Sequence, residues 1–345
     1  MKVLVTGANG HLGTVLTKAL KERGDEVTGF ILPGQNISEI YDYCDHILYG
    51  DVRDLQSLNI AFKGIDVIFH TAGIIDISSS KKMKHLMKSV NIEGVKNVLL
   101  ACKEAKVSRL LYTSSVHAIK EEKGKKETTE SSSFNPRFIK GSYAKTKAIA
   151  TQAVINATHE GLNAVIVHPS GIIGPQDYAM SHMGHMIYNF LTGKLRSYTS
   201  GGYNFVDVRD VVNGILQAEK LGKSGECYIL SGEYHSIKEM LTVMKEITKN
   251  TRHLLFVPHW LAYVVTPFAQ LYYRISKKKP LFTPYSLSTL MSNSNYSYQK
   301  AQSSFGYKTT SFKKTIEDTI SWITEHYHLP IKKNKKMKKE AHKKK

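Results

Sequence analysis

Cysteine is scarce in this sequence. Cys44, Cys102 and Cys227 are its three cysteines, and they lie far apart among 345 residues. They form no CxxC pair, so neither a redox motif nor the spacing of a zinc site is present. The first residues, Met1–Thr6, lead directly into a predicted strand, so we expect no signal or transit peptide. We therefore expect a reduced, cytoplasmic protein without a metal site.

Acidic residues are also few. The chain has 29 Asp and Glu against 48 Lys and Arg, which gives a formal charge of +19. Such an excess can indicate nucleic acid or an anionic membrane as a partner. However, residues 332–345 alone carry nine Lys and one Glu, and no zinc finger or stripe of aromatic and basic residues accompanies them. We expect residues 331–345 to form a basic disordered tail that aids solubility or lies near a membrane, and we expect no nucleic-acid partner.

Long uninterrupted apolar runs are missing as well. The stretch Leu254–Tyr273 is about long enough to cross a bilayer, but two prolines, a histidine and a glutamine interrupt it. We expect a strand followed by a buried helix. The alternative is peripheral membrane contact through residues 254–279, where three lysines follow the apolar stretch. A transmembrane span is the least favoured interpretation.

What the first half does contain is an alternation of apolar runs and amphipathic segments. The apolar runs predict strands that are buried on both faces, and the 3.6-residue pattern between them predicts helices. Such alternation predicts an α/β fold with a doubly wound parallel sheet of the Rossmann type. The predicted strands are Lys2–Thr6, Glu26–Leu32, His46–Tyr49, Asp66–Thr71, Arg109–Ser114 and Asn163–His168, and the predicted helices are Leu12–Arg23, Asp54–Phe62, Lys88–Lys106 and Ser142–Glu160.

After Pro169 the pattern becomes irregular. We interpret residues 1–170 as an NAD(P)-binding domain and residues 171–330 as a smaller substrate-binding lobe that is interleaved with it. Short strands are predicted at Phe205–Asp207 and Cys227–Leu230, and short helices at His182–Leu191, Val208–Lys220, Ile237–Thr248, Tyr298–Phe305 and Phe312–His326.

A glycine-rich turn follows the first predicted strand and opens the first helix. Gly7, Gly10 and Gly13 have the spacing GxxGxxG. In a dinucleotide site the first glycine permits a tight turn, the second lets the backbone approach the pyrophosphate, and the third lets helix and strand pack closely. The helix N-terminus then binds phosphate. The second strand ends at Phe30–Gly34 with neither an acidic nor a basic residue, so NAD or NADP fits, with NAD slightly favoured.

Tyr143 and Lys147 lie four residues apart on a predicted helix, so both side chains project from one face. A phenol normally keeps its proton until about pH 10. A nearby ammonium group favours the phenolate and makes acid/base chemistry accessible near neutrality. The same spacing is common on ordinary helices, so this pair depends on the rest of the chain.

Further motifs extend through nearly the whole chain. They are Thr6–Gly13, Gly50–Asp54, His70–Gly73, Asn91–Gly94, Tyr112–Val116, Tyr143–Lys147, His168–Gly171 and Phe205–Asp210. In this order they resemble the extended branch of the short-chain dehydrogenase/reductase superfamily. The nearest resemblance is to proteins like dihydroflavonol reductase and 3β-hydroxysteroid dehydrogenase.

The resemblance implies a role for each matching residue. Tyr143 is implied as the general acid/base, Lys147 as the residue that favours its phenolate and binds the nicotinamide ribose, and Ser115 as a hydrogen-bond donor to the substrate carbonyl. Asn91 matches an asparagine that helps to shape the site. The implied cofactor-binding residues, besides Tyr143 and Lys147, are Gly7, Asn9, Gly10, His11, Leu12, Gly13, Asp51, Val52, Thr71, Ala72, Gly73, Pro169, Ser170, Gly171 and Ile172.

Other interpretations of single residues remain open. Ser114 is adjacent to Ser115 and could take its place, although the family motif favours Ser115. Asp51 could be only a helix cap. His70 and His117 have no carboxylate partners at metal spacing, so we interpret both as structural or site-lining. Lys145 is expected to point into solvent.

One departure from the family limits the reaction. Sugar 4,6-dehydratases need an acidic pair beside the site Ser or Thr, where this chain has Val116 and His117. We therefore expect reversible hydride transfer between a nicotinamide cofactor and a secondary alcohol or ketone. The alternatives are a nucleotide-sugar epimerase with tightly bound NAD and a non-catalytic NAD(P)-binding sensor.

The expected partners are a small-molecule substrate and a second copy of the chain. The apolar run Trp260–Tyr273 hints at a hydrophobic substrate, although core packing explains it equally well. The resemblance implies a homodimer formed through the helices predicted at Lys88–Lys106 and Ser142–Glu160.

Overall fold

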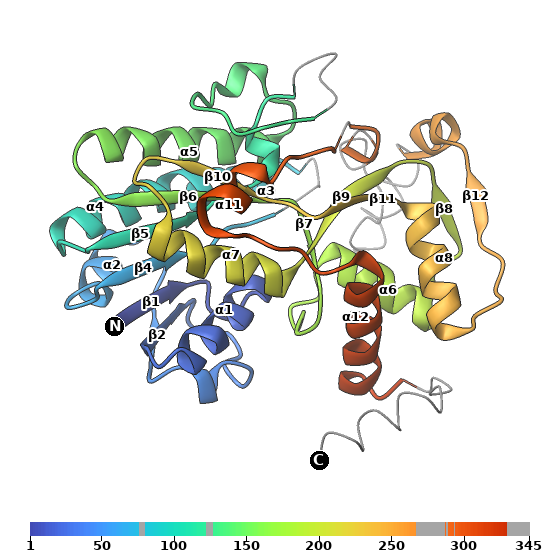
Figure 1. Cartoon of the computed structure of the whole chain (residues 1–345), viewed down its shortest axis with the longest axis horizontal. Coiled ribbons are helices and arrows are strands. Elements are labelled where there is room, and N and C mark those ends of the chain that lie inside the picture. The colour runs from blue at the N-terminus through green and yellow to red at the C-terminus, as the bar shows by residue number, and fades with distance from the viewer. Residues whose placement is uncertain (76–79, 122–126, 267–286, 288, 293, 330–345) are drawn as a thin grey trace.

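The computed structural model describes residues 1–75, 80–121, 127–266, 287, 289–292 and 294–329. These residues form a large layered α/β body with a smaller lobe at one end (Figure 1). The Lys-rich tail at 331–345 and the second half of the apolar stretch, from residue 267 onward, lie outside the described residues.

Seven parallel strands form the main sheet, in the order β10-β6-β5-β4-β1-β2-β3. From β1 the chain runs outward through β2 and β3, then returns to β4 on the other side of β1. This reversal confirms the predicted doubly wound, Rossmann-type sheet, and it creates the crevice at which such sheets bind ligands. The strands are β1 (Lys2–Thr6), β2 (Glu26–Ile31), β3 (His46–Tyr49), β4 (Val67–His70), β5 (Arg109–Thr113), β6 (Ala164–Pro169) and β10 (Cys227–Leu230).

Helices cover both faces of this sheet, which is why its central strands are apolar without alternation. The first group below packs on the apolar core of one face and the second group on that of the other face. The first group is α2 (Leu55–Ala61), α4 (Val95–Glu104) and α5 (Ser142–His159), and the second is α1 (His11–Glu22), α7 (Val208–Leu221) and α11 (Gln299–Phe305).

The helix predicted at Lys88–Lys106 is helical from Lys88 to Glu104, but it begins earlier and includes a π-helical turn. Its consecutive parts are α3 (Lys81–Lys88), the π-helical segment η2 (Ser89–Gly94) and α4. A π-helix fits an extra residue into the turn and changes the direction in which side chains point. Here it encloses Asn91, whose side chain binds both backbone groups of Ile74. A contact of this kind has no trace in helical periodicity, so the sequence predicted the helix but neither its π-helical turn nor its start at Lys81.

The smaller lobe has its own apolar core. Its residues include Ile187, Met240, Leu241, Ile316 and Ile320, which come from three helices. However, α7, β10 and α11 also follow residue 170, and they join the main sheet rather than this lobe. The lobe contains a sheet β11-β9-β7, a strand pair β12-β8 and three helices: β7 (Gly171–Ile173), β9 (Gly202–Asp207), β11 (Glu233–Ser236), β8 (Ser197–Thr199), β12 (Leu255–Val257), α6 (His182–Leu191), α8 (Ile237–Thr248) and α12 (Phe312–His326).

The segment that follows β12 differs from the buried helix that the sequence predicted. Residues 259–266 are helical, as expected, but most of their side chains face solvent instead of the core. Only one side of the helix, with Ala262 and Thr266, is turned inward. The helix lies beyond the three-helix core of the lobe, so no element of the described chain covers its outer side. Among the described residues, no helix is both long enough and apolar enough to cross a bilayer.

Candidate active site

The glycine-rich turn joins β1 to α1 at the crevice of the main sheet. Gly7 has φ +70°, and an added Cβ atom would lie 2.8 Å from the Cα atom of Ala72. An added Cβ at Gly13 would lie 2.1 Å from the carbonyl oxygen of Gly7. Both positions therefore need glycine, the first for its conformation and its contact with the loop after β4, the second for close packing of helix on strand.

The N-terminus of α1 is open for an anion. Gly10 is its N-cap, no side chain caps the free N–H groups, and the first turn has no acidic residue. Free N–H groups and the helix dipole together favour a phosphate at this end. The turn thus fits the pyrophosphate of a dinucleotide, because the space that a Cβ would fill is left for backbone contacts.

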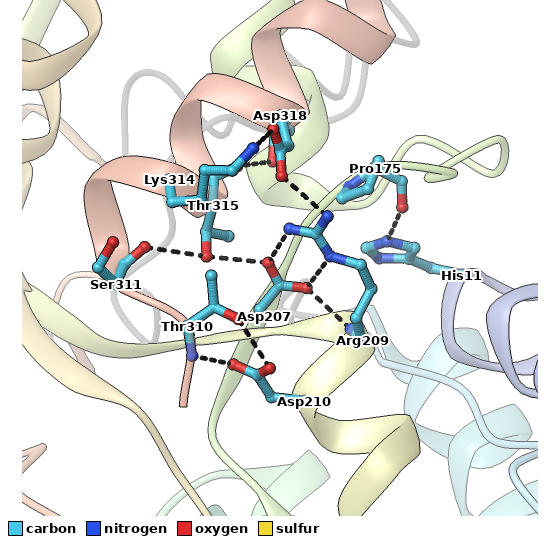
Figure 2. Close-up of polar contacts among 11 residues, drawn as sticks. His11, Pro175, Asp207, Arg209, Asp210, Thr310, Ser311, Lys314, Thr315 and Asp318 are labelled. Carbon is cyan, nitrogen blue, oxygen red and sulfur yellow. Dashed lines mark hydrogen bonds and ion pairs between the residues drawn. The ribbon is translucent and has the colours of Figure 1, made fainter. Parts of the chain in front are cut away.

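The polar side chains of the turn point away from the helix N-terminus. The amide group of Asn9 donates to Oε1 of Gln35 at 2.5 Å, which ties the turn to the loop after β2. His11 lies across the crevice, where its Nε2 atom is 3.0 Å from the carbonyl oxygen of Pro175 (Figure 2). Leu12 packs against the core. These three residues can therefore contribute to a cofactor site mainly through their backbone.

The loop after β4 closes the other side of the crevice. Thr71 donates its hydroxyl proton to the carbonyl oxygen of Thr6 at 2.7 Å. Ala72 is in close contact with Gly7. A Cβ atom at Gly73 would lie 3.5 Å from Nζ of Lys147 and 3.4 Å from Oδ1 of Asn91. The loop therefore connects the turn to the predicted catalytic residues.

Asn91 fixes the position of this loop through hydrogen bonds to its backbone. Its Oδ1 atom accepts from the backbone N–H of Ile74 at 2.8 Å, and its Nδ2 atom donates to the carbonyl oxygen of Ile74 at 2.9 Å. Nδ2 also donates to the hydroxyl of Thr146, which lies next to Lys147 on α5. Asn91 is buried, so these bonds are sheltered from water. Its place suggests that it shapes the site without touching a substrate.

The motif after β3 contains Asp51 and Val52, and its structure excludes the interpretation of Asp51 as a helix cap. Asp51 does not cap α2, because the N-cap of that helix is Asp54. Instead the carboxylate of Asp51 accepts hydrogen bonds from Nε and Nη2 of the Arg53 guanidinium, and these bonds lower the pKa of the carboxyl group. Val52 is buried and touches Gly94. Asp51 and Val52 thus form the wall of the crevice next to β3.

Ser114 and Ser115 have different surroundings at the end of β5. The hydroxyl of Ser114 is 2.6 Å from that of Thr151 and is held inside the body. The hydroxyl of Ser115 accepts from the backbone N–H of His117 at 3.3 Å, at the start of the 3₁₀ turn η3 (Val116–Ala118). This bond uses only a lone pair, so the O–H of Ser115 remains able to donate. The geometry favours Ser115 as the carbonyl donor.

Tyr143 and Lys147 lie in the first turns of α5, both almost fully buried. Nζ of Lys147 donates to the carbonyl oxygen of Thr113 at 2.8 Å and lies 5.3 Å above the ring of Tyr112. Both contacts stabilise the ammonium form. The ring of Tyr143 meets that of His117 edge-on, with centroids 6.3 Å apart. Lys145, between the pair, is exposed as predicted.

The histidines of this region are uncharged at neutral pH. Burial lowers the pKa of His70 to about 3 and that of His117 to about 4. His70 is held by Thr6 at 2.7 Å and stacks on Tyr112, so its role is structural. His117 lines the site beside Tyr143. Lys147 is therefore the positive charge nearest to the crevice among these groups.

Residues 169–172 border the crevice where β6 ends and β7 begins. Pro169 closes β6, and the backbone N–H of Ser170 donates to Leu230 of β10. The hydroxyl of Ser170 has no partner within the described part of the chain. Gly171 and Ile172 belong to β7, a short strand that the sequence did not predict. An added Cβ at Gly171 would lie 2.9 Å from the carbonyl oxygen of Asn204, so this strand also needs glycine.

A polar network that sequence reasoning did not assign holds the lobe against this crevice (Figure 2). The buried carboxylate of Asp207 caps α7, binds Arg209 at 2.6 Å and accepts from the hydroxyl of Thr315 in α12. Arg209 also pairs with Asp318 in α12 at 2.8 Å. Such a network stabilises the fold more strongly when its charges are buried and all of them are hydrogen-bonded. Its signal in the sequence was the motif Phe205–Asp210, but the partners in α12 are about a hundred residues away.

The pKa of Lys147 leads to a prediction about stability. Burial lowers it to about 8 from 10.5. Between these pH values the unfolded chain holds a proton that the folded chain has released, so the unfolding free energy rises with pH. We expect this gain, up to about 3 kcal/mol from pH 8 to 10.5, to be absent in Lys147→Met. Urea denaturation of both cofactor-free proteins measures it, and a pH-independent difference between them would contradict the burial of a titrating Lys147.

Within the residues that the structure describes, no three His, Cys, Asp or Glu side chains are grouped so that they could bind a metal ion. The groups that meet at the crevice are a phenol, an ammonium and a hydroxyl donor, beside a turn that fits a dinucleotide.

The sequence of this chain is similar to those of known proteins. The model of the NAD dependent epimerase/dehydratase family matches residues 3–230. Sterol demethylase protein B of Methylococcus capsulatus is 30% identical over 331 residues, which cover 94% of this chain and 99% of that protein. A 3-beta-hydroxysteroid dehydrogenase of Mycolicibacterium neoaurum is 27% identical over 322 residues, which cover 89% of this chain and 87% of that protein.

A solved structure shows the same fold at lower identity. The crystal structure of the dTDP-glucose 4,6-dehydratase DesIV of Streptomyces venezuelae, with NAD bound, has a TM-score of 0.76 to this chain. The identity is 19%, and the match covers 95% of this chain and 98% of that chain. This similarity concerns the fold alone.

Proposed function

The chain belongs to the NAD dependent epimerase/dehydratase family, and from this premise we propose that it transfers a hydride between a nicotinamide cofactor and a secondary alcohol or ketone. The predicted family and the predicted NAD(P)-dependent oxidoreductase are confirmed by the family match and by relatives that are named dehydrogenases. NAD and NADP are both consistent with this membership.

The proposal depends chiefly on one observation, the convergence of Ser115, Tyr143 and Lys147 beside the glycine-rich turn. Ser115 and Tyr143 both contact His117, and Lys147 adjoins Gly73, which belongs to the wall of the crevice. A binding protein would have no use for a buried ammonium next to a phenol. This is our reason for preferring catalysis to a sensor.

In the proposed reaction each side chain has one task. Tyr143 gives a proton to the substrate oxygen during reduction and takes it back during oxidation. Ser115 donates a hydrogen bond to the same oxygen while negative charge develops on it. Lys147 favours the phenolate through its charge. The nicotinamide, when bound at the glycine-rich turn, supplies or accepts the hydride.

We propose a hydrophobic alcohol or ketone as the substrate. The relatives named above include a sterol demethylase protein and a hydroxysteroid dehydrogenase. His117 is uncharged at neutral pH, and its neighbour in the sequence is Val116. The acidic pair that would help to expel water from a sugar is absent at these two positions, which argues against dehydration.

The test is a panel of sterols, other apolar alcohols and ketones, and nucleotide sugars, assayed with NAD(H) and NADP(H). We expect a net change in nicotinamide absorbance with an apolar member of the panel. NAD that stays bound through purification, with turnover of a nucleotide sugar and no net absorbance change, would indicate epimerisation instead. Cofactor binding without any redox change across the panel would indicate a sensor.

We also propose a homodimer formed through α4 and α5. These helices lie side by side on one face of the main sheet (Figure 1). A groove of about 700 Å³ is lined by residues of both helices and of the loops that follow them. Leu99, Leu100, Ala153 and Ala157 line it, and Leu100 is half exposed. Light scattering is expected to give the mass of two 38.8 kDa chains. The mass of a single chain would refute the dimer.

We propose the cytoplasm as the compartment in which this reaction occurs. Cys44, Cys102 and Cys227 are all unpaired thiols in the structure. Burial raises the pKa of the Cys44 thiol to about 11, so it is unreactive at neutral pH. Thiols of this kind are typical of a reducing compartment.

A further inference from the structure

A row of large apolar side chains is exposed at the far end of the smaller lobe. Leu255 and Phe256 of β12 are 69% and 48% exposed. In the helix that follows, Trp260 is 68% exposed and Val264 58%. With Tyr263 and Val265 these residues form what we call the apolar edge. Monomeric soluble proteins rarely expose so many large apolar groups in one place without a function.

The helical part of the apolar edge has its apolar side chains on one face and is held to the lobe by the other. Trp260, Tyr263 and Val264 have the i, i+3, i+4 spacing that places side chains on one face of a helix. The opposite face is anchored, since Ala262 packs against the lobe core and Thr266 is buried. In Figure 1 β12 and the orange helix above it form the margin of the molecule.

The strand part of the apolar edge is anchored too. β12 pairs in parallel with β8, and the ring of Phe256 contacts that of Tyr198, with centroids 5.5 Å apart. Leu254 packs against the lobe core. Pairing with β8 and packing of Leu254 fix the position of β12. Leu255 and Phe256 are therefore held at the surface.

The sequence segment that carries the apolar edge contains basic but no acidic residues. The sequence contains no Asp or Glu between Glu246 and Glu317. Arg252 and Lys249 precede β12 and are exposed, and so is Arg196, whose carbonyl oxygen accepts from the backbone N–H of Leu255. Exposed apolar side chains with a border of cations, and no anion within the segment, are complementary to an anionic lipid surface.

We propose that the apolar edge docks this protein peripherally on an anionic bilayer. Trp and Tyr are the residues that favour the interface between lipid and water, and both occur on the outer face of the helix. A second copy of the chain is a poorer occupant, because two such edges would bring cations of one sign together. A protein partner would need an acidic apolar surface of matching shape. The proposal does not rest on hydride transfer, so either can fail without the other.

The test uses the intrinsic fluorescence of Trp260. The chain has two tryptophans, Trp260 and Trp322, so the variant Trp322→Phe reports on Trp260 alone. We expect its emission to shift to shorter wavelength with phosphatidylcholine vesicles that contain phosphatidylglycerol. The shift should be weaker with pure phosphatidylcholine and should decrease with salt. An emission spectrum unchanged by anionic vesicles would overturn the proposal.

Sedimentation with the same anionic vesicles tests the surface by mutation in the otherwise unchanged full-length chain. We expect Trp260→Ser with Val264→Ser to lower the bound fraction at least tenfold. The matched control is Ile60→Ser, which removes a side chain that is 63% exposed on α2, and it should bind like the parent. Equal binding by the double variant and the parent would assign the attachment to the Lys-rich tail and would overturn the proposal. Thermal melting of each variant verifies that it is folded.

Discussion

Replacing Tyr143 by phenylalanine is expected to lower kcat by about 10²–10⁴ while the cofactor still binds. The substitution removes only the hydroxyl group, and the ring can keep its edge-on contact with His117. The proton of the reaction then has no donor at this position, whereas the glycine-rich turn is untouched. Steady-state rates with a substrate found in the panel, and titration with the reduced cofactor, measure the two effects separately.

The matched control for this prediction is Tyr112→Phe. Tyr112 is fully buried at the end of β5, and its ring lies under Nζ of Lys147. Phenylalanine keeps a ring in the same place, so the ammonium group of Lys147 keeps its neighbour. We expect nearly parental kcat for this variant. If Tyr143→Phe retained more than about a tenth of the parental rate, Tyr143 would be removed from the proposed mechanism.

Gly13→Ala is expected to damage both the fold and the cofactor site. Its Cβ atom would lie 2.1 Å from the carbonyl oxygen of Gly7 and 2.9 Å from backbone atoms of Ala8. Backbone atoms cannot move aside as a flexible side chain can, so α1 must shift away from β1. We expect a loss of roughly 1–3 kcal/mol or more in unfolding free energy. The Kd of the reduced cofactor should rise at least tenfold, because the N–H groups at the start of α1 move with the helix.

Gly10→Ala is the control for this effect. Its Cβ atom would lie 3.3 Å from the same oxygen of Gly7, a distance that a small adjustment relieves. Urea denaturation of the two cofactor-free variants should therefore show a much smaller loss for Gly10→Ala. Equal losses would mean that close packing at Gly13 does not hold α1 against β1.

Much of the main body could be predicted because its signals are local. The apolar run Val3–Val5, followed by Gly7, Gly10 and Gly13, specifies strand, turn and helix within a few residues. Strand ends agree with the predictions to within one residue at β1, β3 and β10. Parallel strands that are buried on both faces are continuous apolar runs, and this pattern depends only on their own sequence.

The candidate site was proposed from the sequence for a second reason. Tyr143 and Lys147 share a helix face by their spacing alone, and the order of the motifs suggested the family. The choice between Ser114 and Ser115 needed the fold, because it depends on which hydroxyl Thr151 occupies. The alternative role of Asp51 as a helix cap failed for a similar reason, since Asp54 takes that position.

The sequence by itself determined the glycine-rich turn and the spacing of the predicted acid/base pair, because each depends on residues within a few positions of one another. It also indicated the doubly wound sheet, because the alternation of apolar runs and amphipathic segments can be read along the chain. Only the tertiary structure decided the π-helical turn around Asn91, the binding of Asp207 to Thr315 in α12 and the exposure of the apolar edge. An apolar segment has the same pattern of residues in the sequence whether it is buried in a core or exposed to solvent. Which of the two occurs depends on the elements that fold around it, and these come from distant parts of the chain.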